Sequence, residues 1–404
     1  MTDSRPRMFD GLKVVDAGSW VAGPVAATIL ADYGAQVIKI EMPTGDPFRR
    51  LAQGPGTPDA DIDYAWAQDA RNKRSIALNL KTPQGIEVLK KLVAECDIYV
   101  TNYPLAMRRK LGLTYEELKP LNQRMIYASL TAYGEQGPEK DREGFDLIAY
   151  WSRTGLMDLV RQADAKPALS IPGMGDHPTA VALYAAIVSA LYQRERTGEG
   201  SLVHTSLIAN GTWAASCIAA AKFADGSDFS NYPSLTAKYF TRELYQTRDH
   251  RWLQFTMVRT PEEISTFFRV LDASYLLDEP QFQTTRGRIE SGAALANAIQ
   301  PILAQRDANE WIAEFKAAGV PVSMVGSIHD LPDDPQLIAN GILREPDEAI
   351  GSDYVINHPV NVEASGRAPI KRAPDVGEHS DAILMELGYE QADIDRFRAS
   401  DVIA

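Results

Sequence analysis

The stretch that decides the fold comprises Leu12-Lys-Val-Val-Asp16, the turn from Gly18 to Pro24, and Gly34-Ala-Gln-Val-Ile-Lys-Ile-Glu41. Its first and last pieces have the apolar, β-branched composition of buried strands. Pro24 suits the first turn of a helix that we expect to continue through Tyr33. A strand, a helix and a strand in this order predict the start of a parallel sheet. The turn lacks the G-x-G-x-x-G fingerprint, which argues against NAD or FAD as a ligand.

The same alternation continues along the chain and predicts a doubly wound α/β domain, whose ligands bind beyond the carboxyl ends of the strands. We expect strands at 73–79, 97–101, 125–130 and 202–206. We expect helices at 83–95, 113–118, 144–151 and 207–223, and a loop rich in Gly, Pro and Asp at 46–67.

The pattern changes after Asp225, where residues 225–234 are polar and predict a hinge. Beyond it we expect strands at 252–258 and 320–325, helices at 261–271, 293–305 and 308–318, and two tail helices, at 381–387 and from Ala392. The predicted organisation is therefore a large Rossmann-like domain, residues 1–225 and 336–404, with a smaller inserted α/β domain, residues 226–335.

Composition favours a cytoplasmic enzyme or binding protein. The 404 residues are 45% hydrophobic and 24% charged, and the net charge of −13 disfavours nucleic acid and anionic membranes as partners. The N-terminal residues lack an apolar signal region, and the longest apolar run, 214–221, is too short to span a membrane. Cys96 and Cys217 lie in apolar segments, so we expect buried thiols and neither a disulfide nor a zinc site.

One carboxylate stands out in Ile171-Pro-Gly-Met-Gly-Asp-His-Pro-Thr179, just ahead of a long apolar helix that runs toward Gly200. Asp176 is either a turn or N-cap residue, the usual role of Asp in such a sequence, or a functional carboxylate. A carboxylate at the mouth of a buried helix costs desolvation free energy unless something binds it.

The remaining candidates are weaker. The six histidines show no metal-ligand spacing: His177 is expected to point away from Asp176, His204 to lie in the core or at an interface, and His379 to begin a helix. The motifs G-x-S-x-G and H-E-x-x-H and the P-loop are absent from the sequence. Basic residues near the predicted strands are either solvated surface charges or a clamp for a phosphorylated ligand; they are Lys73, Arg74, Lys81, Arg108, Arg109 and Lys110.

Taken in order, eight segments resemble the class III CoA-transferase family, which includes formyl-CoA and crotonobetainyl-CoA (carnitine) transferases. The segments are Gly11–Asp16 with Ala22–Pro24, Leu30–Glu41, Asn72–Lys81, Thr101–Gly112, Gly144–Asp146, Asp176 before its helix, Thr197–Gly200, and Arg372–His379. The resemblance implies a Rossmann-like large domain built from both chain ends, a small inserted domain, and an interlocked homodimer.

The resemblance also implies a reaction. Asp176 would be the catalytic nucleophile, forming first a mixed anhydride and then an aspartyl-CoA thioester. Acyl-CoA and a carboxylic acid would be the substrates, with no permanently bound cofactor and no metal.

The family's coenzyme A contacts carry over to Trp20, Val21, Ala22, Leu78, Lys81, Asn102, Tyr103, Met107 and Lys110. Lys110 falls where the formyl-CoA branch has an arginine. Asp146 falls where that branch has a glutamate near the active site. Tyr150, with Trp20 and Trp151, is an aromatic candidate for lining an acyl pocket.

Two departures argue against oxalate or formate as the acid and in favour of a bulkier one. Met42-Pro43 follow Glu41 where the formyl-CoA branch has a basic residue, and that branch's polyglycine loop has no counterpart between Asp225 and Val258.

Two alternative functions remain. An α-methylacyl-CoA racemase resembles this chain but uses a His in Gly-His-Asp, whereas Phe145 cannot move a proton. A non-catalytic CoA-binding protein would need the basic clamp but not Asp176.

Overall fold

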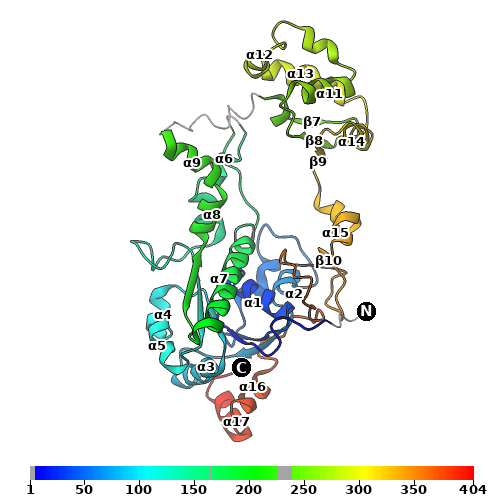
Figure 1. Ribbon diagram of the computed structural model, residues 1–404. Coiled ribbons are helices and arrows are strands. Elements are labelled where there is room, and N and C mark those ends of the chain that lie inside the picture. The colour runs from blue at the N-terminus through cyan, green and yellow to red at the C-terminus, as the bar shows by residue number, and fades with distance from the viewer. Residues whose placement is uncertain (1–4, 163–164, 226–238) are drawn as a thin grey trace. The chain divides into compact units, whose positions relative to one another are not determined.

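The computed structural model describes residues 5–162, 165–225 and 239–404, and the chain forms two compact units (Figure 1). The large unit comprises Met1–Leu156, Leu169–Ser216 and Pro335–Ala404. The small unit comprises Met157–Ala168 and Cys217–Asp334. The predicted hinge falls largely on residues 226–234, outside the described residues.

The large unit is built on a parallel sheet with the strand order β3-β2-β1-β4-β5-β6. The strands are β1 (Lys13–Asp16), β2 (Gln36–Glu41), β3 (Lys73–Ala77), β4 (Ile98–Thr101), β5 (Ile126–Thr131) and β6 (Leu202–Ser206). In the register, Val15 of β1 lies opposite Ile38 on one side and Tyr99 on the other. The strand order reverses between β1 and β4, so the carboxyl ends of these two strands flank the switch point where doubly wound sheets bind ligands.

Helix α1 (Ala22–Asp32) fixes the geometry at this switch point. All of its residues are buried, and it contacts β1, β2 and β4 as well as the long helix α7 (Asp176–Thr197). Small side chains such as Ala26 and Ala27 let α1 pack closely between the sheet and α7. The helix therefore begins at a fixed place directly after the β1 loop.

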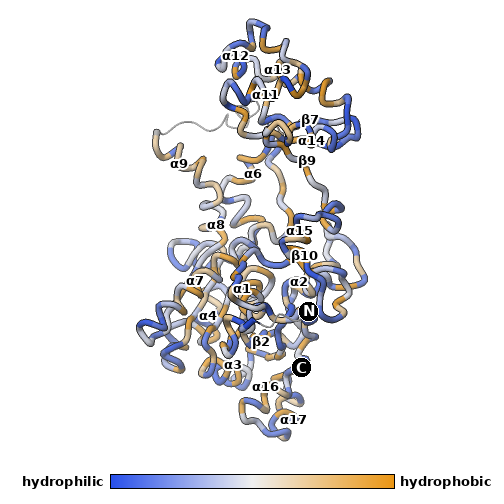
Figure 2. Tube along the Cα trace, turned by 45° about the vertical axis from the view of Figure 1, so that its right-hand side comes forward, coloured by the Kyte–Doolittle hydropathy of each residue, from blue (hydrophilic) through white to orange (hydrophobic). Residues whose placement is uncertain are grey.

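The C-terminal segment closes the other side of the sheet. Leu78, just after β3, pairs with Ile403, and the Asn79 backbone N–H donates to the Val402 carbonyl at 2.9 Å. These side chains share one apolar cluster with α3 (Pro83–Glu95), α16 (Ser380–Glu386) and α17 (Gln391–Ala399). In Figure 2, hydrophobic stretches recur in the sheet and helices of this unit.

The other elements of the large unit are short. They are η1 (Pro47–Gln53), α2 (Tyr64–Asp69), α4 (Leu105–Leu111), α5 (Tyr115–Leu118), η2 (Lys119–Leu121), the π-helical turn η3 (Leu147–Ser152), α8 (Leu207–Ala214), α15 (Pro335–Ala339), β10 (Leu343–Arg344) and β11 (Val355–Ile356).

The small unit has an antiparallel sheet in the order β7-β8-β9, packed against helices around an aromatic core. Phe255 and Phe315 meet edge to face with ring centroids 4.8 Å apart. Its elements are α9 (Ser216–Asp225), η4 (Phe240–Arg242), β7 (Leu244–Gln246), β8 (Trp252–Phe255), α11 (Pro261–Val270), η5 (Ser274–Asp278), α12 (Thr285–Glu290), α13 (Gly292–Leu303), α14 (Ala308–Ala317), β9 (Val322–Met324) and η6 (Ile328–Asp333). Helix α6 (Leu156–Leu159) lies at the boundary between the two units in the chain.

Several expectations are corrected. The region 46–67 contains η1 and the start of α2 rather than only a loop, and α4 is an additional helix. Cys96 is buried as expected, but Cys217, on α9, is exposed. His204 is exposed on β6, which is the edge strand of the sheet, and does not lie in the core.

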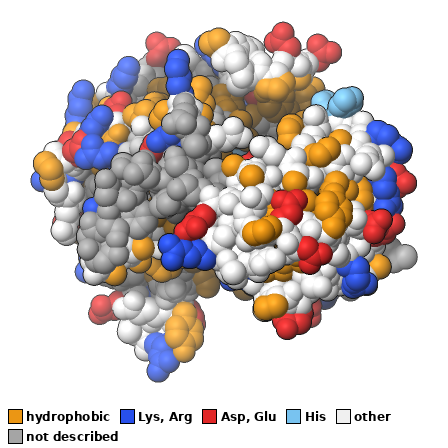
Figure 3. All heavy atoms as spheres, turned by 90° about the horizontal axis from the view of Figure 1, so that it is seen from above, with side chains coloured by type: hydrophobic (Ala, Val, Ile, Leu, Met, Phe, Trp, Pro, Cys, Tyr) orange, Lys and Arg blue, Asp and Glu red, His pale blue; other side chains and the backbone are white. Residues whose placement is uncertain are grey.

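The surface carries charges of both signs. The face seen in Figure 3 shows Lys and Arg side chains beside Asp and Glu side chains. Among the described residues, none of the helices combines the length and the apolar character needed to cross a membrane.

Candidate active site

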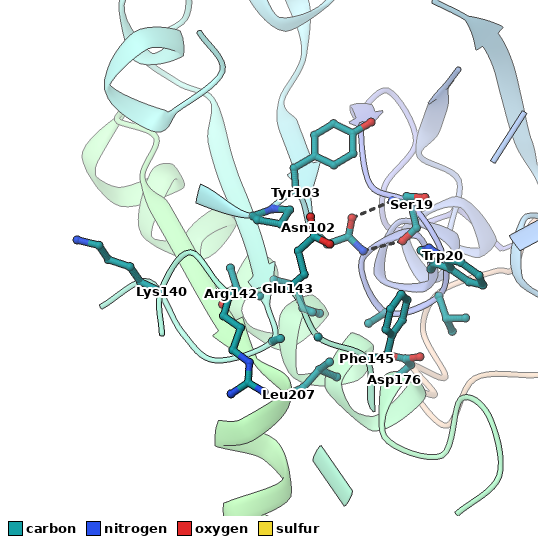
Figure 4. Close-up of a pocket in the computed structure, with 17 residues that line it drawn as sticks. Ser19, Trp20, Asn102, Tyr103, Lys140, Arg142, Glu143, Phe145, Asp176 and Leu207 are labelled. Atoms are coloured by element: carbon teal, nitrogen blue, oxygen red, sulfur yellow. Dashed lines mark hydrogen bonds between the residues drawn. The ribbon is translucent and has the colours of Figure 1, made fainter. Parts of the chain in front are cut away.

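A cavity of about 230 Å³ lies beyond the carboxyl ends of β1, β4 and β5 (Figure 4). Its walls come from the loop after β1, the loop after β4, the segment 130–145 and the start of α7. The lining residues are Ser19, Trp20, Val21, Ala22, Asn102, Tyr103, Pro104, Leu130, Thr131, Ala132, Lys140, Arg142, Glu143, Gly144, Phe145, Asp176 and Leu207. The cavity therefore occupies the switch point of the sheet, where a ligand is expected.

Two hydrogen bonds join the loops after β1 and β4. The Ser19 backbone N–H donates to Asn102 Oδ1 at 2.8 Å, and Asn102 Nδ2 donates to the Ser19 carbonyl at 2.6 Å. The next residue, Trp20, has a φ of 63°, a left-handed conformation that costs a residue with a side chain about 1–3 kcal/mol. Its ring meets Phe145 edge to face, with centroids 5.4 Å apart. Figure 4 shows both rings beside Asp176.

Asp46 holds the turn at Ser19 and Trp20 in place through hydrogen bonds. Oδ1 of Asp46 accepts from the Trp20 backbone N–H and from Ser19 Oγ, each at 3.1 Å. The other oxygen faces Lys39 Nζ at 2.9 Å, and both side chains are almost completely buried. Burial opposes the charge on Lys39, but Asp46, Asp16 and Glu41 outweigh it and raise the pKa of Lys39. The wall formed by Trp20 thus rests on a buried ion pair.

Asp176 is the first residue of α7 and not a turn residue ahead of it. The cap is Gly175, and Asp176 makes no side-chain capping hydrogen bond, so the N-cap interpretation is wrong. The Gly175 backbone N–H instead donates to Asp146 Oδ2 at 3.0 Å. A Cβ on Gly175 would lie 2.6 Å from Tyr150 Cγ and 2.9 Å from Asp146 Cβ. Only glycine permits this approach, which brings the start of α7 against Asp146.

The environment of Asp176 favours its protonated form. Burial, followed by repulsion from the Asp146 carboxylate, raises the pKa of Asp176 to about 7. His177 opposes this rise and Asp69 adds to it. The positive end of the α7 dipole favours the anion. A carboxylate with a pKa near 7 beside a cavity is a candidate for covalent or acid–base chemistry.

His177 bridges two acceptors. Its Nδ1 lies 2.9 Å from the Gly173 carbonyl, and its Nε2 lies 3.2 Å from Asp69 Oδ1 at the end of α2. Burial lowers the pKa of His177, but the hydrogen bond to Asp69 and its charge outweigh burial and raise the pKa to about 9. The turn before α7 is thereby tied to α2.

The structure brings together six of the predicted site residues. Asp176 lines the cavity together with Trp20, Val21, Ala22, Asn102 and Tyr103. Asp146 and Tyr150 lie behind the start of α7 rather than on the cavity wall; both are buried, as is Trp151.

The other predicted contacts lie elsewhere. Leu78 is fully buried in the apolar cluster around α3, and Lys81, Met107 and Lys110 are exposed outside the cavity lining.

Lys73 and Arg108 are neither solvated surface charges nor parts of a clamp for a phosphorylated ligand. Lys73 begins β3, far from its carboxyl end, and its buried amine pairs with Asp16 at 2.9 Å. Arg108 is buried and donates two hydrogen bonds of 2.8 Å to the Glu135 carboxylate. Both cations neutralise internal acids, so neither is available to a phosphate.

Sequence reasoning missed several lining residues. Arg142 and Glu143 come from a charged loop after β5, and Phe145 was considered only as a replacement for a catalytic histidine. Their position in the sequence could have identified them, because they follow a strand whose carboxyl end faces the switch point. Figure 4 shows Lys140 directed away from the other lining residues. Among the described residues, no cluster of three or more His, Cys, Asp or Glu side chains is arranged to hold a metal.

Comparison with known proteins places this geometry in a family. The family model described as CoA-transferase family III matches residues 9–380. The chain belongs to CoA-transferase family III. This membership confirms the family resemblance.

Curated relatives of this CoA-transferase family III chain match it over nearly its whole length. (R)-2-hydroxy-4-methylpentanoate CoA-transferase of Clostridioides difficile is 30% identical, over 98% of this chain and 99% of the relative. Cinnamoyl-CoA:phenyllactate CoA-transferase of Clostridium sporogenes is also 30% identical, over 97% and 96%. A solved structure of a CAIB/BAIF family protein from Brucella suis matches with a TM-score of 0.82 and 29% identity, covering 95% of this chain and 100% of that one. The large Rossmann-like unit with its parallel sheet is thus the fold of the family.

Proposed function

We propose that this member of CoA-transferase family III moves coenzyme A from an acyl-CoA donor to a free carboxylic acid, with Asp176 as the covalent nucleophile. One observation carries the proposal: the Asp176 carboxylate, at the first residue of α7, lines the cavity at the switch point of the sheet. Family membership and the names of the curated relatives support coenzyme A transfer as the reaction.

The first half of the reaction exchanges one activated acyl group for another. An Asp176 oxygen attacks the thioester carbonyl carbon of the donor, the carbon–sulfur bond breaks, and the CoA thiolate leaves behind a mixed anhydride. The thiolate then attacks the Asp176 carbonyl carbon of the anhydride. The donor acid leaves as its carboxylate, and Asp176 becomes an aspartyl-CoA thioester.

The second half reverses these steps with a new acid. The acceptor carboxylate attacks the aspartyl thioester, which releases the thiolate and forms a second anhydride. The thiolate attacks the acceptor's acyl carbon, forming the product acyl-CoA and restoring the Asp176 carboxylate. Each step joins two species held in one cavity, so positioning supplies much of the acceleration.

The protein environment suits this role. A carboxylate in water is a weak nucleophile, and partial burial of Asp176 strips away part of its hydration. With a pKa of about 7, Asp176 is ionised, and therefore nucleophilic, in the upper half of the physiological pH range. The loop held by Ser19 and Asn102 presents the residues Trp20, Val21 and Ala22, which we propose contact coenzyme A together with Asn102 and Tyr103.

The aromatic wall favours a branched or aromatic acyl group. Trp20 and Phe145 form an apolar surface beside Asp176, and Phe145, which lines the cavity, is half exposed. Two relatives at 30% identity are named for acids of this kind, 4-methyl-2-hydroxypentanoate and phenyllactate. We therefore propose a 2-hydroxy acid with a branched or aryl side chain as the acceptor, rather than oxalate or formate.

A substrate screen tests the reaction. Purified protein is incubated with acyl-CoA donors and with 2-hydroxy acids, dicarboxylates and formate, and new thioesters are identified by mass spectrometry. Hydroxylamine added during turnover should leave a hydroxamate on Asp176. Asp176→Ala should abolish transfer yet still bind coenzyme A, and Asp395→Asn, at an exposed position on α17, should transfer normally.

Three results would contradict the proposal. Transfer retained by Asp176→Ala would exclude the nucleophile. Exchange of the α-proton of a 2-methylacyl-CoA with solvent deuterium, without transfer, would indicate a racemase instead. Binding of coenzyme A with neither activity would indicate a non-catalytic binding protein.

A further inference from the structure

The two acceptors that face the His177 ring favour its charged form. The Gly173 carbonyl and the Asp69 carboxylate can only accept hydrogen bonds. Each faces a different ring nitrogen, at 2.9 Å and 3.2 Å. A ring that donates to both acceptors carries a proton on each nitrogen, and such a ring is an imidazolium cation. The side chain of Asp69 is almost fully buried, so its carboxylate is a well-shielded partner for that cation.

The His177 cation lies next to a group of acidic side chains at the start of α7. Apart from His177, the charged side chains that act on Asp176 are acidic: Asp146 beside Gly175, and Asp69 at the end of α2. Tyr150 is packed behind Gly175, and the cavity that Asp176 lines also carries Lys140, Arg142 and Glu143. Without His177, the first turn of α7 would hold the Asp176 carboxylate near two further carboxylates and no side-chain cation from its own turn.

We propose that His177, held as an imidazolium by Asp69 and the Gly173 carbonyl, is a positioning residue that keeps the neighbouring Asp176 ionised. This inference rests on the proposed role of Asp176 as the nucleophile. His177 touches no reacting atom in the scheme above. It acts through its charge and by fixing the turn Gly173–Gly175 from which α7 begins.

The pH dependence of transfer separates this role from simple support of the fold. Loss of a neighbouring opposite charge raises a carboxyl pKa by about 1–3 pH units. His177 is half exposed, which places the expected change at the lower end, about one unit. We expect His177→Gln to move the acidic limb of kcat upward by about one pH unit. Turnover at pH 6 then falls about tenfold, while turnover at pH 9 changes little.

Charge rescue and coupling sharpen the test. His177→Lys retains a cation and should return the limb toward its original position. Asp69→Asn should move the limb less than His177→Gln does, because it frees the ring from its partner but also removes an acid that raises the pKa of Asp176. The double variant of His177→Gln and Asp69→Asn should likewise shift the limb less than His177→Gln alone. Arg396→Gln, which removes one exposed charge on α17, is the matched control and should leave the limb unchanged. Activity is measured with the donor and acid pair that gives the highest turnover in the screen.

A measurement without substrate tests the pair itself. In protein labelled with ¹⁵N-histidine, the His177 resonance, assigned by its loss in His177→Gln, should show a proton on both ring nitrogens at pH 7.5. In Asp69→Asn at the same pH, one ring proton should be lost. A neutral His177 ring in the native enzyme overturns the inference. So does a stationary acidic limb in active His177→Gln enzyme when Asp176→Asn is inactive. Turnover retained by Asp176→Asn overturns the proposed function instead.

Discussion

Replacing Asp176 with Asn should stabilise the protein while it abolishes transfer. The pKa of Asp176 lies at about 7, against an ordinary value of 3.8, because burial and Asp146 disfavour the anion. At about 1.4 kcal/mol per pH unit, this rise of about 3 units sets a ceiling of about 4 kcal/mol. Asp176 keeps part of its surface in water, and solvent screening reduces the expected gain to about 2 kcal/mol.

The sign follows from proton binding. The folded state binds the proton more tightly than the unfolded state, so ionised Asp176 destabilises the fold as pH rises from about 4 to 7, and the full cost is present above 7. Asp176→Asn should therefore exceed the native protein by about a quarter of the full amount at pH 4.5 and by the full amount at pH 8. The expected rise in Tm at pH 8 is about 2 °C for a chain of 404 residues, measured by circular dichroism. Asp395→Asn should show no such change.

Two results would refute this reasoning. Equal Tm values at pH 8 would mean that the carboxylate is not electrostatically strained. An equal gain at pH 4.5 and pH 8 would mean that the effect comes from packing rather than from charge. A pH-dependent gain together with lost transfer would identify Asp176 as a residue kept for chemistry at the expense of stability.

Other perturbations probe the supports of the site. Gly175→Ala should lower stability by about 2 kcal/mol, because its Cβ would overlap Tyr150, whereas Gly326→Ala, with open space around it, should not; thermal unfolding of both variants checks this. Lys73→Met should lower the free energy of unfolding by about 3–5 kcal/mol in denaturant titrations, because it leaves the buried Asp16 without its partner. Lys13→Met breaks an exposed ion pair and should lower that free energy by less than about 1 kcal/mol. Equal losses for the two lysines would contradict the buried network. We also expect light scattering to show a homodimer, because the large unit exposes the large apolar side chains of Leu169, Ile171 and Trp213. A monomer at micromolar concentration would contradict this prediction.

Local patterns predicted the large sheet because several of its strands are short runs rich in β-branched residues, such as Lys13–Asp16, Gln36–Glu41 and Ile98–Thr101. The helix 83–95 was predicted to the residue, since Thr82 caps it and Pro83 opens it. Helix α4 escaped prediction because its seven residues include three consecutive basic ones, which conceal the apolar period.

The site was only partly readable for a different reason. Its key contacts join residues distant in sequence, such as Asp69 with His177, 108 positions apart, and Asp146 with Gly175, 29 apart. Nor does any local pattern distinguish Lys73, buried in an ion pair, from Lys81, which is exposed. The pKa of Asp176 depends on the charged groups that surround it in space, and the order of residues along the chain does not show which groups those are.

The pairing of Leu78 with Ile403 has a consequence for biosynthesis. A ribosome delivers the chain from its N-terminus, and β3 would emerge more than three hundred residues before the segment that covers it. Residues 239–334, whose aromatic core is contiguous in sequence, can collapse while synthesis continues. The parallel sheet must wait, with part of its apolar surface uncovered, until α16 and α17 have left the exit tunnel. The interval before α16 and α17 emerge is therefore when a nascent molecule most needs a chaperone.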